Sequence, residues 1–193
     1  VYGAFEARDK ETNRVPVLDL TPFLSLLDWL TGVQALRTRD DADELAILLQ
    51  DAHSRPWRQK KDNIVDDDLP RRLGGLANTI LRLSQALHQA RPIEIMENAG
   101  RLKEQLPDVQ GEVERWAKPF AVLLEMVANE YTPFSSKTPK KVNVENLHKQ
   151  AGIIRRYADK GLVMPAMSLA REWMVNYVIM YIEPENWLVL DSR

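Results

Sequence analysis

The sequence DVQGEVERWAKPFAVLLEMVANEY, residues 108–131, indicates the fold most clearly. Its apolar side chains recur at intervals of three and four, which places them on one side of a helix with 3.6 residues per turn. They are Val109, Val113, Trp116, Phe120, Leu123, Leu124 and Val127. Pro119 must bend this helix, because proline lacks an amide hydrogen and its ring crowds the preceding turn. The stretch therefore predicts an amphipathic helix of a helical bundle.

The same periodicity predicts helices before this stretch. Thr21 can cap a helix that begins at Pro22. The apolar face of that helix is expected to comprise Phe23, Leu26, Leu27, Leu30, Val33 and Leu36. A shorter helix should open with the acidic residues 40–44, and residues 54–68 should form a loop. Helices over residues 69–91 and 93–106 should follow and end at Pro92 and Pro107.

Two more helices are expected after residue 131. Residues 132–142 contain two prolines and three lysines, which predicts a mobile excursion. Asn143 or Asn146 can cap the next helix, and Gly161 can end it in a left-handed conformation. The last helix should begin near residue 164 and stop at Pro184. Apolar residues nearly encircle it, so it should be either central to the bundle or part of a subunit interface.

Few residues outside these helices fit extended structure. Residues 1–5 and 15–18 are expected to form two short extended pieces around a turn. Residues 186–190 fit either a short strand or an incomplete helix. The fold class is therefore mainly α.

The composition excludes several classes of protein. The 193 residues carry 26 Lys and Arg against 28 Asp and Glu, and no cysteine. A near-neutral chain has no global basic field for nucleic acid, and without cysteine it holds no disulfide, thiolate metal site or iron–sulfur cluster. No uncharged stretch reaches the roughly 20 apolar residues of a membrane-spanning helix. We expect a cytoplasmic protein that does not bind membranes.

No motif for a metal or a cofactor is present. His53, His88 and His148 lie too far apart to show a metal-binding spacing and should be polar members of helix surfaces. Gly74 and Gly75 lack the lysine of a phosphate-binding loop, so a kink or a close helix contact is expected there. We predict no metal and no cofactor.

One pair matches a catalytic pattern loosely. Metal-independent ribonucleases of the HEPN class use an arginine followed after four to six residues by a histidine, which handles the proton of a ribose hydroxyl. Arg82 and His88 satisfy this spacing. A chain rich in arginine meets so loose a spacing by chance, so we expect a solvent-facing His88 and assign no catalytic residue.

Basic and aromatic residues allow two interpretations each. Three basic clusters could contact phosphate, and each also fits a solvated surface. They comprise Arg55, Arg58, Lys60 and Lys61; Lys137, Lys140 and Lys141; and Arg155 and Arg156. Trp29, Trp116 and Trp173 lie on apolar helical faces and should be core residues, whereas Trp57 and Trp187 flank loops and could serve an interface.

Several segments, read in order, resemble one family. Residues 1–8 (VYGAFEAR), 16–23 (PVLDLTPF) and 27–29 (LDW) look like the junction between the sensor domain and the helical domain of CRISPR-associated proteins of the DxTHG type. Residues 150–157 (QAGIIRRY), 161–162 (GL) and 166–173 (AMSLAREW) look like later helices of that helical domain.

This resemblance implies a fold and an activity. Such proteins belong to type III CRISPR systems and join a Rossmann-like CARF domain, which binds cyclic oligoadenylate, to a HEPN domain that degrades RNA as a homodimer without a metal. Ligand binding at the first domain switches the second. The resemblance assigns residues 1–18 to the end of a CARF-like domain and residues 19–193 to a HEPN-like multi-helix bundle.

The sequence departs from the family pattern at the catalytic motif. The DxTHG motif is absent, and Arg171 is followed by Asn176 where a histidine is required, because an amide cannot exchange the proton. We therefore expect a segment that supplies the helical scaffold and dimer interface of an antiviral ribonuclease, with RNA as the parent protein's substrate. The alternatives are a non-catalytic helical interaction module and a regulatory domain that binds nucleic acid through Lys137, Lys140 and Lys141.

Overall fold

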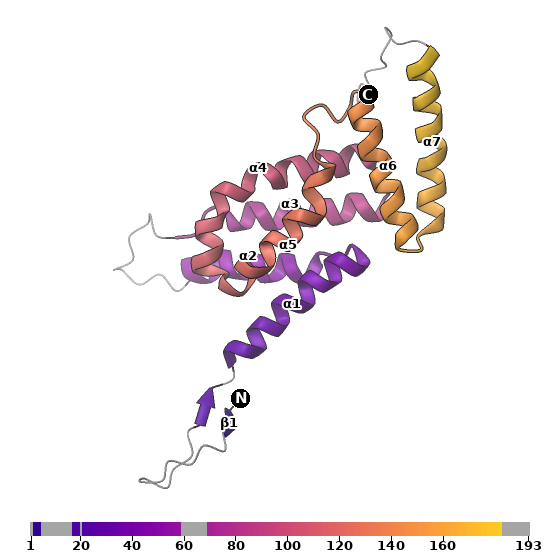
Figure 1. Cartoon of the computed structure of the whole chain (residues 1–193). Coiled ribbons are helices and arrows are strands. Elements are labelled where there is room, and N and C mark those ends of the chain that lie inside the picture. The colour runs from indigo at the N-terminus through magenta and orange to yellow at the C-terminus, as the bar shows by residue number, and fades with distance from the viewer. Residues whose placement is uncertain (1, 5–16, 20, 59–68, 183–193) are drawn as a thin grey trace.

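The fold is a bundle of α-helices with a helical hairpin beside it (Figure 1). The computed structural model describes residues 2–4, 17–19, 21–58 and 69–182. Within these ranges the helices are α1 (Thr21–Arg39), α2 (Asp43–Arg58), α3 (Leu73–His88), α4 (Pro92–Trp116), α5 (Lys118–Tyr131), the 3-10 helix η2 (Thr132–Phe134), α6 (Val144–Asp159) and α7 (Val163–Ile182). The prediction of a mainly helical fold is confirmed.

Two short strands precede the helices. Strands β1 (Tyr2–Ala4) and β2 (Val17–Asp19) pair antiparallel, with Tyr2 opposite Asp19. In Figure 1 they lie beyond the start of α1, away from the bundle. The expected extended pieces are confirmed at residues 2–4, 17 and 18, and β2 continues one residue further, to Asp19. The rest of residues 1–5 and 15–18, and all of residues 186–190, fall outside the described residues.

Helix α3 forms the centre of the bundle. It packs against α2 and α4, while α5 packs against α4 and α1. Its large buried side chains are Leu73, Leu76, Ile80, Leu83 and Leu87. Between α1 and α5, Trp29 of α1 stacks on the fully buried Phe120 of α5, with the ring centroids 5.5 Å apart. Each such side chain stabilises the bundle by about 1.5–3 kcal/mol through burial.

Only the second half of α1 joins this core. Val33 and Leu36 are buried as expected, together with Trp29. The apolar residues of the first half are exposed, namely Phe23, Leu24, Leu26, Leu27 and Leu30. Figure 1 shows this half of α1 extending beyond the bundle toward the strands, where no other described helix covers it. Of the six residues predicted to share one apolar face, only Val33 and Leu36 are therefore buried.

The break between α4 and α5 lies at Ala117 and not at Pro107. Helix α4 continues through Pro107, and Val109 and Val113 remain buried on its inner face. Ala117 leaves the helical conformation with φ −128° and ψ 44°. Pro119 then falls in the first turn of α5, where its missing amide hydrogen costs no hydrogen bond. The predicted division into helices 93–106 and 108–131 is wrong, because buried apolar contacts outweigh one lost hydrogen bond at Pro107.

The boundaries around residues 54–72 also differ from the prediction. Helix α2 continues to Arg58 instead of ending before Ser54. Asp51 forms ion pairs with Arg55 and Arg58, which supports this last part of α2. The indole of Trp57 donates a hydrogen bond to the carbonyl of Pro70 over 2.8 Å, so this tryptophan serves an internal contact.

The start of α3 is fixed by a distant carboxylate. Glu112 Oε2 accepts hydrogen bonds from the backbone amides of Arg71, Arg72 and Leu73 at 3.0, 2.8 and 3.2 Å. A carboxylate at a helix amino end satisfies free amides and complements the helix dipole. Helix α3 therefore begins at Leu73, four residues later than the apolar period at Leu69 predicts, and ends at His88 before Ala90, which has a positive φ of 51°.

Helices α6 and α7 form a hairpin that lies beside the bundle (Figure 1). The side chain of Asn143 caps α6 by accepting a hydrogen bond from the amide of Asn146 at 2.7 Å. Gly161 adopts a φ of +72°, as its left-handed role predicts, and α7 follows. Of the two caps considered, Asn143 is the one used.

Residues 132–142 connect the bundle to this hairpin. Asn146 donates hydrogen bonds to the carbonyls of Thr138 and Lys141 at 2.6 and 2.7 Å. Ser136 Oγ donates to the side-chain oxygen of Asn146 at 2.6 Å. The segment is thus attached to the first turn of α6, and the mobility expected for it stays a prediction.

Candidate functional site

The most conspicuous surface feature is the outer face of α7. This helix packs against α6 through the buried side chains of Ala166 and Leu169. Trp173 lies on the same face, half-buried, and its indole donates a hydrogen bond to the carbonyl of Leu147 at 2.8 Å. The expectation that α7 is central to the bundle is wrong, as is a core position for Trp173, because the described residues cover only one face of α7. Trp116 is also only partly buried.

The remaining faces of α7 expose large apolar side chains. Met164 is 79% exposed, Tyr181 70% and Ile182 71%. The full set is Val163, Met164, Met167, Met174, Val175, Tyr177, Val178, Tyr181 and Ile182. Large exposed apolar patches are typical of interaction sites, so this face of α7 is a candidate for one.

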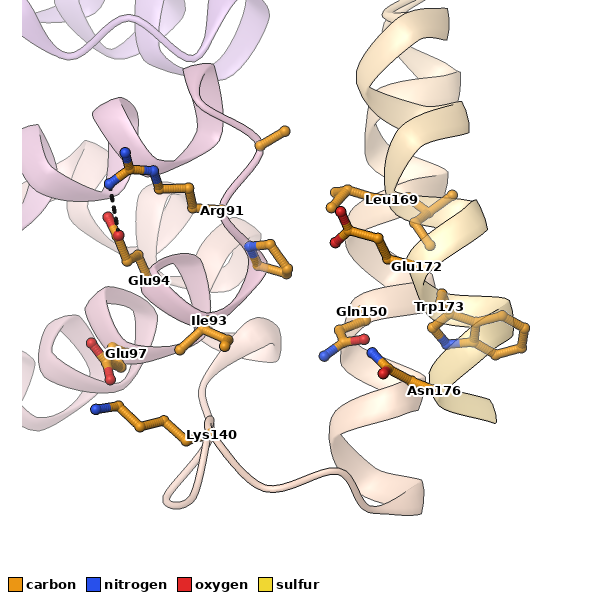
Figure 2. A pocket seen from close by; sticks show the side chains of 13 residues that line it. Arg91, Ile93, Glu94, Glu97, Lys140, Gln150, Leu169, Glu172, Trp173 and Asn176 are labelled. Atoms are coloured by element: carbon orange, nitrogen blue, oxygen red, sulfur yellow. Dashed lines mark hydrogen bonds and ion pairs between the residues drawn. The ribbon is translucent and has the colours of Figure 1, made fainter. Parts of the chain in front are cut away.

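A cavity of about 640 Å³ separates the hairpin from the start of α4 (Figure 2). Its apolar wall includes Ile93, Ile154 and Leu169. In Figure 2 the side chain of Lys140 points toward Glu97 on the α4 side of the cavity, whereas the amides of Gln150 and Asn176 lie close together on the hairpin side. Arg91 at its edge forms an ion pair with Glu94 at 2.9 Å.

The lining of this cavity suits binding more than covalent chemistry. Its charged side chains include the carboxylates Glu94, Glu97 and Glu172 and the amine of Lys140. No hydroxyl, thiol or imidazole is among the side chains that line it. No group of three metal-ligating side chains occurs anywhere in the described part of the chain.

A buried polar cluster attaches the hairpin to the bundle. Asp40, at the turn between α1 and α2, is 1% exposed and adopts a left-handed φ of 58°. Its Oδ1 accepts hydrogen bonds from Nη2 of Arg156 on α6 at 2.6 Å and from Nζ of Lys160, which directly follows α6, at 2.7 Å. Arg156 also pairs with Glu130 at 2.7 Å, and Glu130 pairs with Arg37 at 2.6 Å. These ion pairs join α1, α5 and α6, and we call them the Asp40 cluster.

Two buried tyrosines complete this attachment. Tyr131 receives a hydrogen bond from Arg156 and donates one to the carbonyl of Leu36, both at 2.9 Å. Tyr157 donates to the carbonyl of Leu87 at 2.5 Å. Burial raises the pKa of both phenols above the ordinary value of 10.0. Both therefore remain neutral donors at any physiological pH.

Burial and the contacts between cluster members shift the pKa values of the two basic groups that face Asp40. Burial alone lowers the pKa of Arg156, but the neighbouring charges and hydrogen bonds raise it by more, so the guanidinium stays charged. The pKa of Lys160 lies below its ordinary value, because burial outweighs its pairing with Asp40. These groups face one another inside the protein, so we interpret the cluster as an attachment and not as a catalytic site.

The structure does not bring Arg82 and His88 together. They are six residues apart on α3, so their side chains leave the helix in directions that differ by about 120° around its axis. Both are exposed, as expected, and His88 Nε2 lies 3.0 Å from the carbonyl oxygen of Arg39. Asn176 lines the cavity, whereas Arg171 does not.

The basic residues considered as phosphate contacts differ in their exposure. Arg156, one of the possible phosphate contacts, is buried in the Asp40 cluster, so that interpretation is wrong for it, whereas Arg155 is exposed. Lys137, Lys140 and Lys141 are exposed, while Lys60 and Lys61 lie outside the described residues.

Two of the histidines and the paired glycines can also be placed. His148 is exposed on α6. A Cβ atom on Gly74 would lie 3.1 Å from the ring of His53, which confirms a close helix contact there. His53 Nδ1 is buried without a hydrogen-bond partner, so this histidine is less of a surface residue than expected.

Sequence reasoning missed Asp40, Glu130 and Glu112. The sequence pattern assigns Asp40 to the acidic start of α2, but the partners of its carboxylate, Arg156 and Lys160, are 116 and 120 residues away in sequence. The only local signal was that Asp40 directly follows the basic end of α1, where a residue that tolerates a left-handed conformation ends a helix. Its partners could not be derived from any local pattern.

Comparison with known proteins places this helical bundle in a family. Residues 25–136 match the model of a family described as CRISPR-associated protein MJ1674, second domain. The match covers more than half of the chain, so the chain belongs to this family, and the expectation of a CRISPR-associated protein is confirmed. It spans most of α1 and all of α2 to η2, and leaves the α6–α7 hairpin outside.

Two other comparisons gave no relatives. No curated protein and no solved structure matches the chain. Among the described residues, no helix is long and apolar enough to cross a membrane.

Proposed function

We propose that this chain is the helical effector part of a type III CRISPR accessory protein in cytoplasmic antiviral defence. The observation that carries this proposal is the family match over residues 25–136. The segments at residues 1–8, 16–23, 150–157 and 166–173, which resemble CARF–HEPN proteins of the DxTHG type, support it from both sides of the match.

In this proposal the chain crosses a domain boundary. Residues 1–18 end a CARF-like sensor domain that binds cyclic oligoadenylate, and residues 19–193 form a HEPN-like domain. The β1–β2 pair beside the start of α1 fits such a boundary, as do the exposed apolar residues of α1, which would pack against the sensor domain.

The chain's own contribution is a scaffold and a surface for self-association. Metal-independent ribonucleases of this class build one composite site from two protomers, so a stable arrangement of helices and a dimer contact are both required. The buried core of α1–α5 supplies the first, and the outer face of α7 is suited to the second. We assign no catalytic residue within residues 1–193.

RNA cleavage by the intact parent protein tests this proposal. Cleavage of a fluorogenic single-stranded RNA should rise on addition of a cyclic oligoadenylate and should be unchanged by a chelator of divalent metals. A linear oligoadenylate of the same length is the control. Cleavage that no cyclic oligoadenylate of any ring size stimulates would contradict the proposed activity.

A second candidate is a non-catalytic interaction module. It is favoured by the separation of Arg82 from His88 and by the amide at Asn176. This candidate predicts that the intact protein binds its partner but cleaves no RNA under any condition of the same assay.

A further inference from the structure

The cavity between α4 and the hairpin holds polar side chains that make no contact with one another. Glu97, Lys140 and Glu172 line it, and none of them forms an ion pair within the described residues. The amides of Gln150 and Asn176 line it as well, and neither side chain is hydrogen-bonded within the same part of the chain. All five groups are therefore available to a bound molecule.

The hairpin wall of the cavity carries one negative charge. Leu169, Glu172 and Asn176 are spaced by three and four residues, which places them on one side of α7. In Figure 2 the carboxylate of Glu172 is directed toward α4, and the amides of Asn176 and Gln150 lie close together below it. Glu172 is the one charged side chain that α6 and α7 contribute to the lining. A carboxylate beside two amide oxygens suits an ammonium or guanidinium group, which only donates hydrogen bonds.

The opposite wall presents both signs of charge. The side chain of Lys140 points toward the carboxylate of Glu97 on α4 (Figure 2). The backbone around Lys140 is held in place, because Asn146 donates hydrogen bonds to the carbonyls of Thr138 and Lys141. An ammonium next to a carboxylate is complementary to the α-carboxylate and α-ammonium groups of a free amino acid.

Apolar side chains line the space between these polar groups. Ile93 of α4, Ile154 of α6 and Leu169 of α7 all contribute to the cavity. They suit the aliphatic part of a ligand whose two ends are polar. The volume of about 640 Å³ lies within the range of roughly 300–1,000 Å³ that is typical of small-molecule sites.

We propose that this cavity binds a free amino acid with a cationic side chain, of which arginine is the best-fitting example. Arg91 and Glu94 at the edge already pair with each other. The unpaired lining charges are the two carboxylates of Glu97 and Glu172 and the ammonium of Lys140. Free arginine carries two positive charges and one negative charge, so every charge meets its opposite.

The proposal assigns a role to each wall. Lys140 and Glu97 hold the α-carboxylate and the α-ammonium, whereas Glu172 and the two amides hold the guanidinium. The ligand would then bridge α4 and the hairpin and strengthen the attachment of the hairpin to the bundle. This site is additional to the proposed function and does not depend on RNA cleavage.

Calorimetric titration of the full chain with L-arginine and its analogues tests the charges of the ligand. L-Citrulline has nearly the same shape but an uncharged side chain, and agmatine lacks the carboxylate. Each should bind at least about tenfold more weakly than arginine. Nα-acetyl-arginine amide, which mimics an arginine within a peptide, should also bind more weakly, because both of its backbone charges are removed.

Two variants test the assignment of the walls. Glu172→Gln should weaken arginine binding about tenfold or more and should abolish the preference for arginine over citrulline. Lys140→Gln should weaken arginine binding but leave agmatine binding unchanged, because agmatine has no carboxylate for Lys140 to hold. Glu125→Gln, an exposed change on α5 that does not line the cavity, is the control and should bind arginine as the unmodified chain does.

Hydrogen exchange provides an independent readout. Arginine should slow exchange in α6 and α7 in the unmodified chain and in Glu125→Gln, but not in Glu172→Gln. Circular dichroism verifies that each variant is folded.

Four outcomes would overturn the proposal. They are no binding of arginine at about 10 mM, equal affinity for citrulline, equal affinity for the blocked arginine, and unchanged arginine affinity in Glu172→Gln. Equal affinity for the blocked arginine would identify the cavity as a site for a peptide side chain instead. Loss of RNA cleavage in the parent protein would leave this inference unaffected.

Discussion

Helices α3 and α7 are both rich in apolar residues, but they have different surroundings. Helix α3 lies between α2 and α4 and buries leucines and an isoleucine along its whole length. Helix α7 is no less apolar in sequence, yet only Ala166 and Leu169 are buried. Apolar composition therefore identifies a helix that needs a partner, and the tertiary structure decides whether that partner lies within the same chain.

The comparison extends to the way each helix is held. Helix α3 is held by packing, whereas the hairpin that carries α7 is attached to the bundle partly through the Asp40 cluster. Ion pairs in a buried site are sensitive to loss of either partner, because the remaining charge is left without compensation. The predictions below separate these two kinds of attachment.

The largest expected effect comes from a truncation in α3. Leu83→Ala removes a fully buried side chain and should lower the free energy of unfolding by about 4 kcal/mol. Met174→Ala, at an exposed position of α7, should change the unfolding of the monomer by less than about 0.5 kcal/mol. Urea unfolding followed by circular dichroism measures both. Equal losses would mean that α7 is buried within the chain after all.

The next effect concerns the Asp40 cluster. Asp40→Asn keeps a residue that tolerates the positive φ but removes the charge that faces Arg156 and Lys160, so unfolding should become easier by about 3 kcal/mol. Hydrogen exchange should accelerate most in α6. Asp159→Asn, an exposed change on the same helix, is the control and should alter neither measurement.

An alkaline destabilisation should follow from Tyr131 and Tyr157. The pKa of each phenol is raised in the folded state, so above pH 10 the unfolded chain loses these protons while the folded chain keeps them. Stability should therefore fall as the pH rises through 10, by roughly 2 kcal/mol at pH 11. The lowered pKa of Lys160 acts in the opposite direction and offsets part of this loss.

Urea midpoints measured between pH 8 and pH 11 test this sign. Phenolate absorbance should show that two tyrosines ionise only when the chain unfolds. Stability that stays constant up to pH 11 would contradict the assignment of buried, neutral phenols.

The smallest effect is expected at Arg82 and His88. Both are exposed on α3, so the double change to alanine should alter stability by less than about 1 kcal/mol and leave any RNA cleavage by the parent protein unchanged. Replacement of Ser84 is the contrast. This residue is buried one helical turn before His88, and its hydroxyl donates a hydrogen bond to the carbonyl of Asp40 at 2.5 Å. Loss of cleavage on replacing Arg82 and His88 would show that the pair is catalytic.

Local signals predicted the parts of the fold that local chemistry controls. The start of α1, the Asn143 cap and the left-handed Gly161 follow from residue preferences within a few positions. The break at Ala117 did not follow, because Pro107 and Pro119 are locally equivalent and only burial around α4 distinguishes them.

The candidate site was harder to predict from the sequence than the fold. The apolar residues that nearly encircle α7 were visible in the sequence, and an interface was one of the two interpretations offered for them. Which interpretation holds depends on what covers the helix, and that is a tertiary property. The Asp40 cluster was not predictable, because Asp40 and Arg156 are 116 residues apart and no local pattern relates them.

The most direct test of this account is the rate of RNA cleavage by the parent protein carrying Met167→Glu, relative to the unmodified protein. With cyclic oligoadenylate present, the account predicts rapid cleavage by the unmodified dimer and at least a tenfold loss in the variant. Val122→Glu, a matched change at an exposed position of α5, should cleave at the unmodified rate. Equal rates for Met167→Glu and the unmodified protein would contradict the claim that α7 pairs to assemble the ribonuclease.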